Sequence, residues 1–93
     1  MYEGLEYEFN LFKKDVDNGV TFCRYFDEDD YEDEYSHNEI HEFQSRFIDM
    51  AKEYLHKETP NRYIITSGWC VFVMSIEEAK RRNMKRIDNY IVK

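Results

Sequence analysis

The residues from Asp27 to Tyr35, DEDDYEDEY, form a run in which seven of nine positions are carboxylates. The other two are tyrosines, and Phe, Trp and Tyr make up 17% of the chain, whereas disordered acidic tails are usually poor in aromatic residues. We therefore expect this run to form a fixed, negatively charged surface. Such a surface repels nucleic acid and attracts basic proteins, and it raises the rate of association with them at low salt.

Two patterns in the sequence are partial matches to metal sites. His37 and His41 stand one helical turn apart and could supply half of a zinc site, but no cysteine pair is near them to supply the other half. The acidic run resembles a calcium loop only in its charge, because the central glycine and the terminal bidentate Glu are missing. The sequence therefore predicts no specific metal site and no cofactor.

Catalytic motifs are not visible in the sequence. It has no Gly-rich phosphate loop and no nucleophile elbow. Carboxylates are plentiful, but crowded exposed acids do not identify a general acid unless a cleft surrounds them. We predict that the chain is not an enzyme, and a deep pocket with a shielded carboxylate would reopen that question.

The charge of the chain is distributed unevenly. Residues 1–59 carry 17 acidic and 6 basic side chains (−11), whereas residues 60–93 carry 3 acidic and 7 basic ones (+4), which gives the net −7. The bases form a cluster made of Lys80, Arg81, Arg82, Lys85 and Arg86. Because the net charge is negative, we expect this cluster to neutralise the acidic half of the same chain or of a second copy, in a homodimer, and not to bind nucleic acid directly.

Length and hydropathy predict one soluble domain that spans residues 1–93. The first three residues lack a basic leader, and the longest apolar run, from Trp69 to Met74, has six residues where about 20 are needed to cross a membrane. Cys23 and Cys70 lie in separate apolar stretches and are expected to be reduced core thiols. These features favour a cytoplasmic location without a membrane partner.

The first segment carries two overlapping apolar patterns. One alternates as in a strand: Leu5, Tyr7, Phe9 and Leu11. The other repeats at helical spacing: Leu5, Phe9, Phe12 and Val16. We favour the helix, because Asn18 and Gly19 follow it as a C-terminal stop signal. Residues 20–26 then read as a strand, and the acidic run reads as a loop.

A long helix is expected from about His37 to Lys57, because Ser36 and Glu39 form a capping box and Pro60 follows its end. One face of this helix is apolar: Ile40, Phe43, Phe47, Ala51, Tyr54 and Leu55. The acids on the opposite side fall within about 80° of one another at 100° per residue, and Arg46 interrupts them. They are Glu39, Glu42, Asp49 and Glu53.

The last third of the chain reads as two strands, a short helix and a final strand. Residues 63–66 and 69–74 are expected to pair through a tight turn at Ser67 and Gly68, although one long bent strand also fits. Ser75 and Glu78 form a second capping box that opens a helix to about Asn83, and residues 87–92 would close the sheet. The order α-β-α-β-β-α-β predicts an α+β domain with a small antiparallel or mixed sheet and helices packed mainly on one face.

Aromatic residues are expected to supply most of the core, at about 1.5–3 kcal/mol for each large side chain that is fully buried. The candidates are Phe9, Phe12, Phe22, Phe43, Phe47, Trp69 and Phe72.

With its acidic run and acidic helix face, the chain resembles the small phage-encoded DNA-mimic inhibitors. In size and Tyr-rich acidity it is most similar to the anti-restriction nuclease (Arn) proteins of T-even phages, and the anti-CRISPR proteins are the near alternative. The resemblance implies a dimeric decoy in the host cytoplasm that occupies the DNA-binding surface of a basic host protein, such as a restriction nuclease or a nucleoid protein.

On this interpretation, two rows of carboxylates imitate phosphates, which give a duplex one charge per roughly 1.7 Å of its axis. The first row is Asp27, Glu28, Asp29, Asp30, Glu32, Asp33 and Glu34, and the second is Glu39, Glu42, Asp49 and Glu53. Tyr31 and Tyr35 would add rigid contacts to the bound partner. Two alternatives remain open: an adaptor or antitoxin-like regulator that binds a basic protein without imitating DNA, and an acidic face that only keeps the protein soluble.

Overall fold

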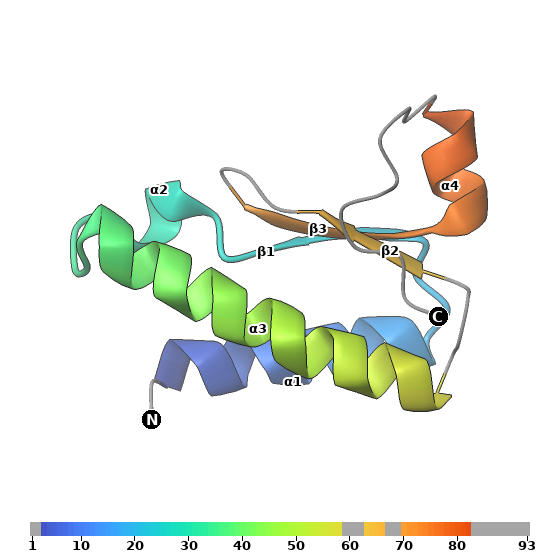
Figure 1. Cartoon of the computed structure of the whole chain (residues 1–93), viewed down its shortest axis with the longest axis horizontal. Coiled ribbons are helices and arrows are strands. Elements are labelled where there is room, and N and C mark those ends of the chain that lie inside the picture. Colours follow the sequence, from blue (N-terminus) through green and yellow to red (C-terminus); the bar gives the residue numbers. More distant parts are fainter. Residues whose placement is uncertain (1–2, 59–62, 67–69, 83–93) are drawn as a thin grey trace.

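The computed structural model describes residues 3–58, 63–66 and 70–82. These residues form an α+β fold (Figure 1), as predicted. Its elements, in chain order, are α1 (Glu3–Asp17), β1 (Phe22–Tyr25), α2 (Glu28–Tyr31), α3 (His37–Glu58), β2 (Tyr63–Thr66), β3 (Val71–Ser75) and α4 (Ile76–Arg81). The strand expected over residues 87–92 lies outside the described residues.

The three described strands form an antiparallel sheet in the order β1-β3-β2. Tyr25 of β1 is opposite Val71, and Ile65 of β2 is opposite Val73. Since β2 and β3 pair with each other, the alternative of one long bent strand is wrong. The turn expected at Ser67 and Gly68 lies outside the described residues.

Two long helices cover one face of the sheet. In Figure 1, α1 and α3 lie side by side below the sheet, whereas the short α4 stands at one end of it on the opposite side. The side chains of β3 follow this division, because Val71 and Val73 join the main core while Phe72 and Met74 pack in a smaller cluster with Ala79 of α4. The prediction that the helices pack mainly on one face is confirmed.

The ends of the helices follow local sequence signals. Gly19 has a φ of +74°, and the hydrogen bonds from Gly19 N to Val16 O and from Val20 N to Asp15 O close α1 in a Schellman motif. At the start of α3, Ser36 N donates to Glu39 Oε1 over 3.0 Å. Glu39 N donates back to Ser36 Oγ over 3.2 Å, so the predicted capping box is present.

The main core, between the sheet and the two long helices, combines aliphatic side chains with a group of packed aromatic rings. Phe12 and Phe47 are fully buried, and their ring centroids lie 5.6 Å apart in an edge-on contact. Among the seven predicted core aromatics, Phe43 is also buried, three are partly buried, and Trp69 lies outside the described residues. The three partly buried ones are Phe9, Phe22 and Phe72.

Both cysteines are free thiols, and Cys70 is buried while Cys23 is half-buried. Burial raises the pKa of both thiols, which keeps them protonated and unreactive at neutral pH. In the part of the chain that the structure describes, no helix has the length and apolar character needed to cross a membrane.

Candidate protein-binding surface

The acidic run contains a turn of helix, and the prediction that it is a loop is wrong for residues 28–31. The side chain of Asp27 accepts a hydrogen bond from Asp29 N at 3.0 Å and caps this turn, α2. Acidic residues are favoured here, because the helix dipole stabilises negative charge in the first turn. Past α2, Glu34 N and Tyr35 N both donate to Tyr31 O, so the run stays folded to its end.

Tyr31 fixes α2 to the core. Its ring centroid lies 5.5 Å from that of Phe26, and its hydroxyl donates to Glu8 Oε1 of α1 over 3.1 Å. Gly4 provides the space for this ring, since a Cβ at that position would lie only 3.2 Å from Tyr31 Cε1. The aromatic side chain was expected at the bound surface, but it is half-buried and holds the acidic run in place.

Tyr35 makes a second attachment at the other end of the run. Its ring packs edge-on against Phe43 of α3, with 4.9 Å between the centroids. This tyrosine is also half-buried. Both tyrosines therefore pack against the core of their own chain, which leaves at most part of each ring for a partner.

Glu28 departs most from its predicted role. It was counted among the exposed acids, yet its side chain is only 7% exposed, and its Oε1 lies 2.9 Å from His41 Nε2 and 3.3 Å from His37 Nδ1. The first position of α2 faces the start of α3, so this carboxylate lies between the two elements. It is a third attachment of the run and not part of a charged surface.

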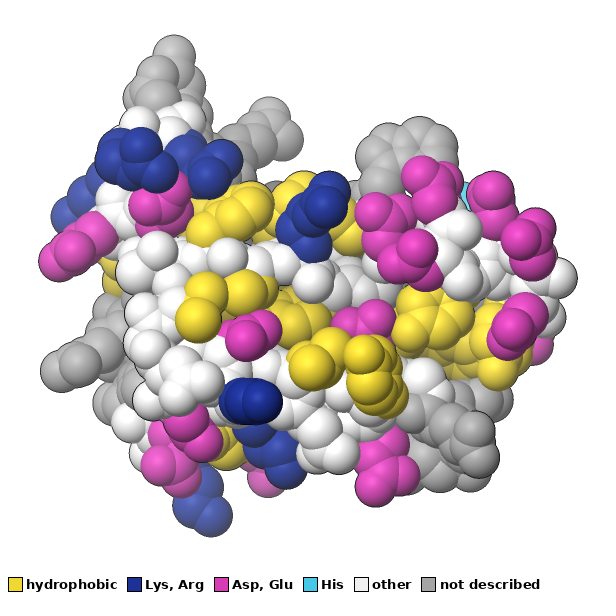
Figure 2. Space-filling view, turned by 180° about the vertical axis from the view of Figure 1, so that it is seen from behind, with side chains coloured by type: hydrophobic (Ala, Val, Ile, Leu, Met, Phe, Trp, Pro, Cys, Tyr) yellow, Lys and Arg dark blue, Asp and Glu magenta, His cyan; other side chains and the backbone are white. Residues whose placement is uncertain are grey.

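Asp27, which caps α2, is half-buried, and the other five acids of the run are exposed. They form what we call the acidic platform: Asp29, Asp30, Glu32, Asp33 and Glu34. Figure 2 shows carboxylates gathered near the end of the molecule that carries α2, and Lys and Arg side chains gathered near the end that carries α4. The carboxylates of the platform and the described bases of α4 therefore lie at opposite ends of the molecule.

The second predicted row, on α3, is exposed but sparse. Glu39, Glu42, Asp49 and Glu53 all reach solvent, and the first and last of them are 14 residues apart, or about 21 Å of helix at 1.5 Å per residue. Arg46 Nη2 lies 3.0 Å from Glu42 Oε1, so one of the four charges is paired within the helix. The platform is thus the densest array of negative charge among the described residues.

Glu8 is a buried carboxylate that the sequence analysis did not single out. It is 9% exposed, and burial raises its pKa, although the hydrogen bonds from Tyr31 and from the Phe26 backbone oppose that effect. A signal was present: Glu8 stands three residues after Leu5 and four before Phe12, on the apolar face of α1. This carboxylate connects α1 to the acidic run.

The raised pKa of Glu8 has a predictable effect on stability. Because the pKa of Glu8 is raised on folding, the folded chain binds the proton of this carboxyl group more tightly than the unfolded chain does. The stabilisation from the protonated group is therefore complete below the ordinary Glu pKa of about 4.3, and it is lost as the pH rises through the pKa of the folded chain. Glu8→Gln keeps an acceptor for Tyr31, and we expect it to be more stable than the parent at pH 7 and to lose that advantage near pH 4. Urea unfolding at both pH values, with the exposed Glu6→Gln as the control for charge removal, would check this. An equal loss of stability at both pH values would contradict it.

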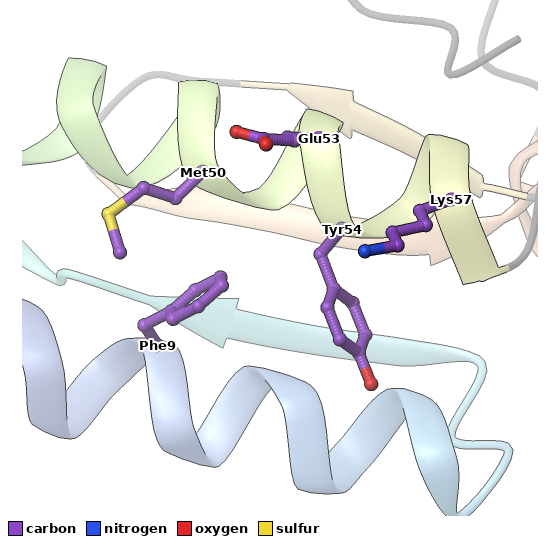
Figure 3. A pocket seen from close by; sticks show the side chains of 5 residues that line it. All are labelled: Phe9, Met50, Glu53, Tyr54 and Lys57. Atoms are coloured by element: carbon purple, nitrogen blue, oxygen red, sulfur yellow. The ribbon is translucent and has the colours of Figure 1, made fainter.

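A groove of about 310 Å³ runs between α1 and α3. In Figure 3, Phe9 rises from α1 between Met50 and Tyr54, which extend toward it from α3. The hydroxyl of Tyr54 donates to Asp17 Oδ1 over 2.8 Å, and this bond raises the pKa of Tyr54 to about 12. The carboxylate that lines the groove, Glu53, is exposed and so lacks the shielding expected of a general acid.

The basic end forms its own ion pairs. Arg81 Nη2 pairs with Glu78 Oε1 of the same helix, and Arg82 Nε lies 2.8 Å from that oxygen. Hydrogen bonds from both arginines lower the pKa of Glu78, and the Arg82 guanidinium also lies 4.0 Å from the ring centroid of Phe22. These two bases therefore pair with a carboxylate of their own end of the chain, and not with the acidic half, residues 1–59, as one of the two predictions had it. Lys85 and Arg86 lie outside the described residues.

Comparisons with protein-family models, with curated proteins and with solved structures give no match to this chain. Its function is therefore inferred from the geometry of its own residues.

Proposed function

We propose that this protein binds the DNA-binding surface of a basic protein through the acidic platform and inhibits that protein by competing with DNA. The observation that supports this most is the attachment of the platform, because its five outward carboxylates sit on a segment held to the core through Glu28, Tyr31 and Tyr35. The exposed acids of α3 extend the negative surface away from it.

Fixed charges favour binding over simple solubilisation. Side chains and loops lose about 0.5–1.5 kcal/mol of entropy for each flexible group that is ordered in a complex, so a surface that is ordered beforehand binds more tightly. Holding five like charges close together also costs repulsion energy, which a flexible tail would avoid. A surface that served only solubility would need neither the buried Glu28 nor the two packed tyrosines.

The class of partner follows from charge and from the resemblance to phage-encoded DNA-mimic inhibitors. A dense negative array complements a groove that binds phosphates, so the targets that fit are a restriction nuclease or a nucleoid protein of a host bacterium. Pairing of two copies would lengthen the negative surface, and the homodimer remains part of this proposal.

The second candidate is an adaptor or antitoxin-like regulator that binds one basic protein without imitating DNA. The low charge density of α3 favours it, because four acids over about 21 Å fall well short of one charge per roughly 1.7 Å in a duplex. On this alternative the platform alone would form the contact.

Affinity capture from a bacterial lysate, followed by identification of the retained basic protein, would supply the partner for a direct test. We expect the affinity for that partner to fall at least tenfold between 50 mM and 300 mM salt, because charges farther apart than about 10 Å are screened at 0.1 M. A DNA mimic would also be displaced by duplex DNA in a competition assay, whereas the adaptor would remain bound. An affinity that does not change with salt would contradict both candidates.

A further inference from the structure

Three side chains with metal-binding atoms converge where α2 meets the start of α3. The atoms are one carboxylate oxygen of Glu28 and one ring nitrogen each of His37 and His41, and all of them lie within 4.8 Å of one another. The imidazoles stand one helical turn apart on α3, with 4.2 Å between their ring centroids. The carboxylate comes from the other element, nine residues before the first imidazole.

We propose that Glu28, His37 and His41 form a binding site for a divalent transition-metal ion, with Zn²⁺ as the best fit. Zn²⁺ binds imidazole nitrogen and carboxylate oxygen at about 2.0–2.2 Å, so two ligand atoms on a tetrahedral ion lie about 3.3–3.5 Å apart. The separation of 3.3 Å between Glu28 Oε1 and His37 Nδ1 already meets this value. The separation of 2.9 Å to His41 Nε2 requires a widening of roughly half an ångström, which a rotation of that half-exposed ring provides.

The burial of Glu28 also favours a cation. A carboxylate removed from water is costly unless it is compensated by charge and hydrogen bonds. Within the described part of the chain, Glu28 pairs with the two imidazoles, and these carry charge only when they are protonated. A divalent ion would supply permanent positive charge at the same place, with the imidazoles as neutral ligands.

The ligand types select the class of metal. Two nitrogens and one oxygen suit Zn²⁺, Co²⁺, Ni²⁺ or Cu²⁺, whereas Ca²⁺ and Mg²⁺ prefer oxygen ligands throughout. The imidazoles of His37 and His41 are 69% and 51% exposed, so an ion can enter from solvent. A tetrahedral ion with three ligands from the protein would keep one position for water or for a group of a bound partner.

The proposal is tested with the full chain, free of any affinity tag and treated with a chelator. Calorimetric titration with Zn²⁺ is expected to show one ion per chain, and Co²⁺ is expected to produce visible absorption bands typical of four-coordinate nitrogen and oxygen ligands. His37→Ala and His41→Ala should each weaken Zn²⁺ binding at least tenfold. His56→Ala is the matched control, because His56 is exposed at the far end of the same helix and should leave binding unchanged.

The two histidine variants decide the outcome, because Glu28→Gln replaces a buried carboxylate that also attaches α2 to α3, so its effect on metal binding would not be separable from an effect on folding. Circular dichroism confirms that each variant is folded, and Zn²⁺ should raise the melting temperature of the parent chain but not that of His41→Ala. The proposal is overturned if the parent binds no Zn²⁺ in the micromolar range, or if His56→Ala loses as much affinity as His41→Ala. Neither result involves a protein partner, so the metal site and the proposed function can fail separately.

Discussion

Removing three carboxylates from the acidic platform should weaken binding to the basic partner by about threefold to a hundredfold. The variant is Asp29→Asn, Glu32→Gln and Glu34→Gln combined. An exposed ion pair contributes about 0.2–1 kcal/mol, so three lost together amount to about 0.6–3 kcal/mol, and each 1.4 kcal/mol is tenfold in affinity. A single change such as Asp30→Asn should therefore cost at most about 1 kcal/mol. Calorimetric titration against the captured partner at low salt measures both effects.

The matched control also removes three negative charges, but at the opposite end of the molecule. Asp17→Asn and Glu58→Gln alter exposed side chains at the last residues of α1 and α3, and Glu77→Gln alters one in the first turn of α4. In Figure 1 these ends of the helices lie at the opposite end of the molecule from α2. Asn at position 17 can still accept the hydrogen bond from Tyr54. The control should bind the partner nearly as well as the parent chain. If both triple variants weaken binding equally, net charge and not the platform drives association, and the DNA-mimic proposal fails.

The parts of the fold that were predicted correctly depend on local signals. The capping box of Ser36 and Glu39 involves residues three positions apart, and the stop at Gly19 depends on the backbone freedom of one residue. The apolar face of α3 repeats at the helical period over 22 residues. Each of these signals can be read in a short window, so tertiary contacts were not needed to find them.

The organisation of the acidic run depends on contacts between residues that are far apart in the sequence, so a short stretch of sequence cannot show it. Seven carboxylates in nine positions look alike in sequence, but Glu28 is turned inward because the imidazoles of α3 lie opposite it in the folded chain. The two histidines were noticed as half of a zinc site, and the missing ligand was hidden because Glu28 had been counted as a surface charge. The inward role of Tyr31 likewise depends on Glu8, 23 residues away.

Phe26→Ala should lower the free energy of unfolding by about 3–5 kcal/mol, the usual loss when a buried Phe is truncated. The side chain is 1% exposed, and its ring centroid lies 5.5 Å from those of both Tyr31 and Phe47. Because Phe26 comes just before α2, its loss should also release the platform and weaken partner binding, although no charge is removed. Urea unfolding gives the first effect, and titration of the partner under folded conditions gives the second.

The backbone of Phe26 allows a sharper version of this experiment. Its φ of +53° lies in the left-handed region, where a residue with a Cβ is disfavoured by about 1–2 kcal/mol, and its carbonyl accepts a hydrogen bond from Gln44 Nε2 at 2.9 Å. Phe26→Gly removes more side chain than Phe26→Ala but relieves this strain, so we expect Gly to be no less stable than Ala here. Phe72→Ala, at a half-buried ring of the smaller cluster beside α4, is the control for the loss of a ring and should leave partner affinity unchanged. If Phe72→Ala weakens partner binding as much as Phe26→Ala does, the attachment of α2 to the core is not what holds the platform carboxylates in place for binding.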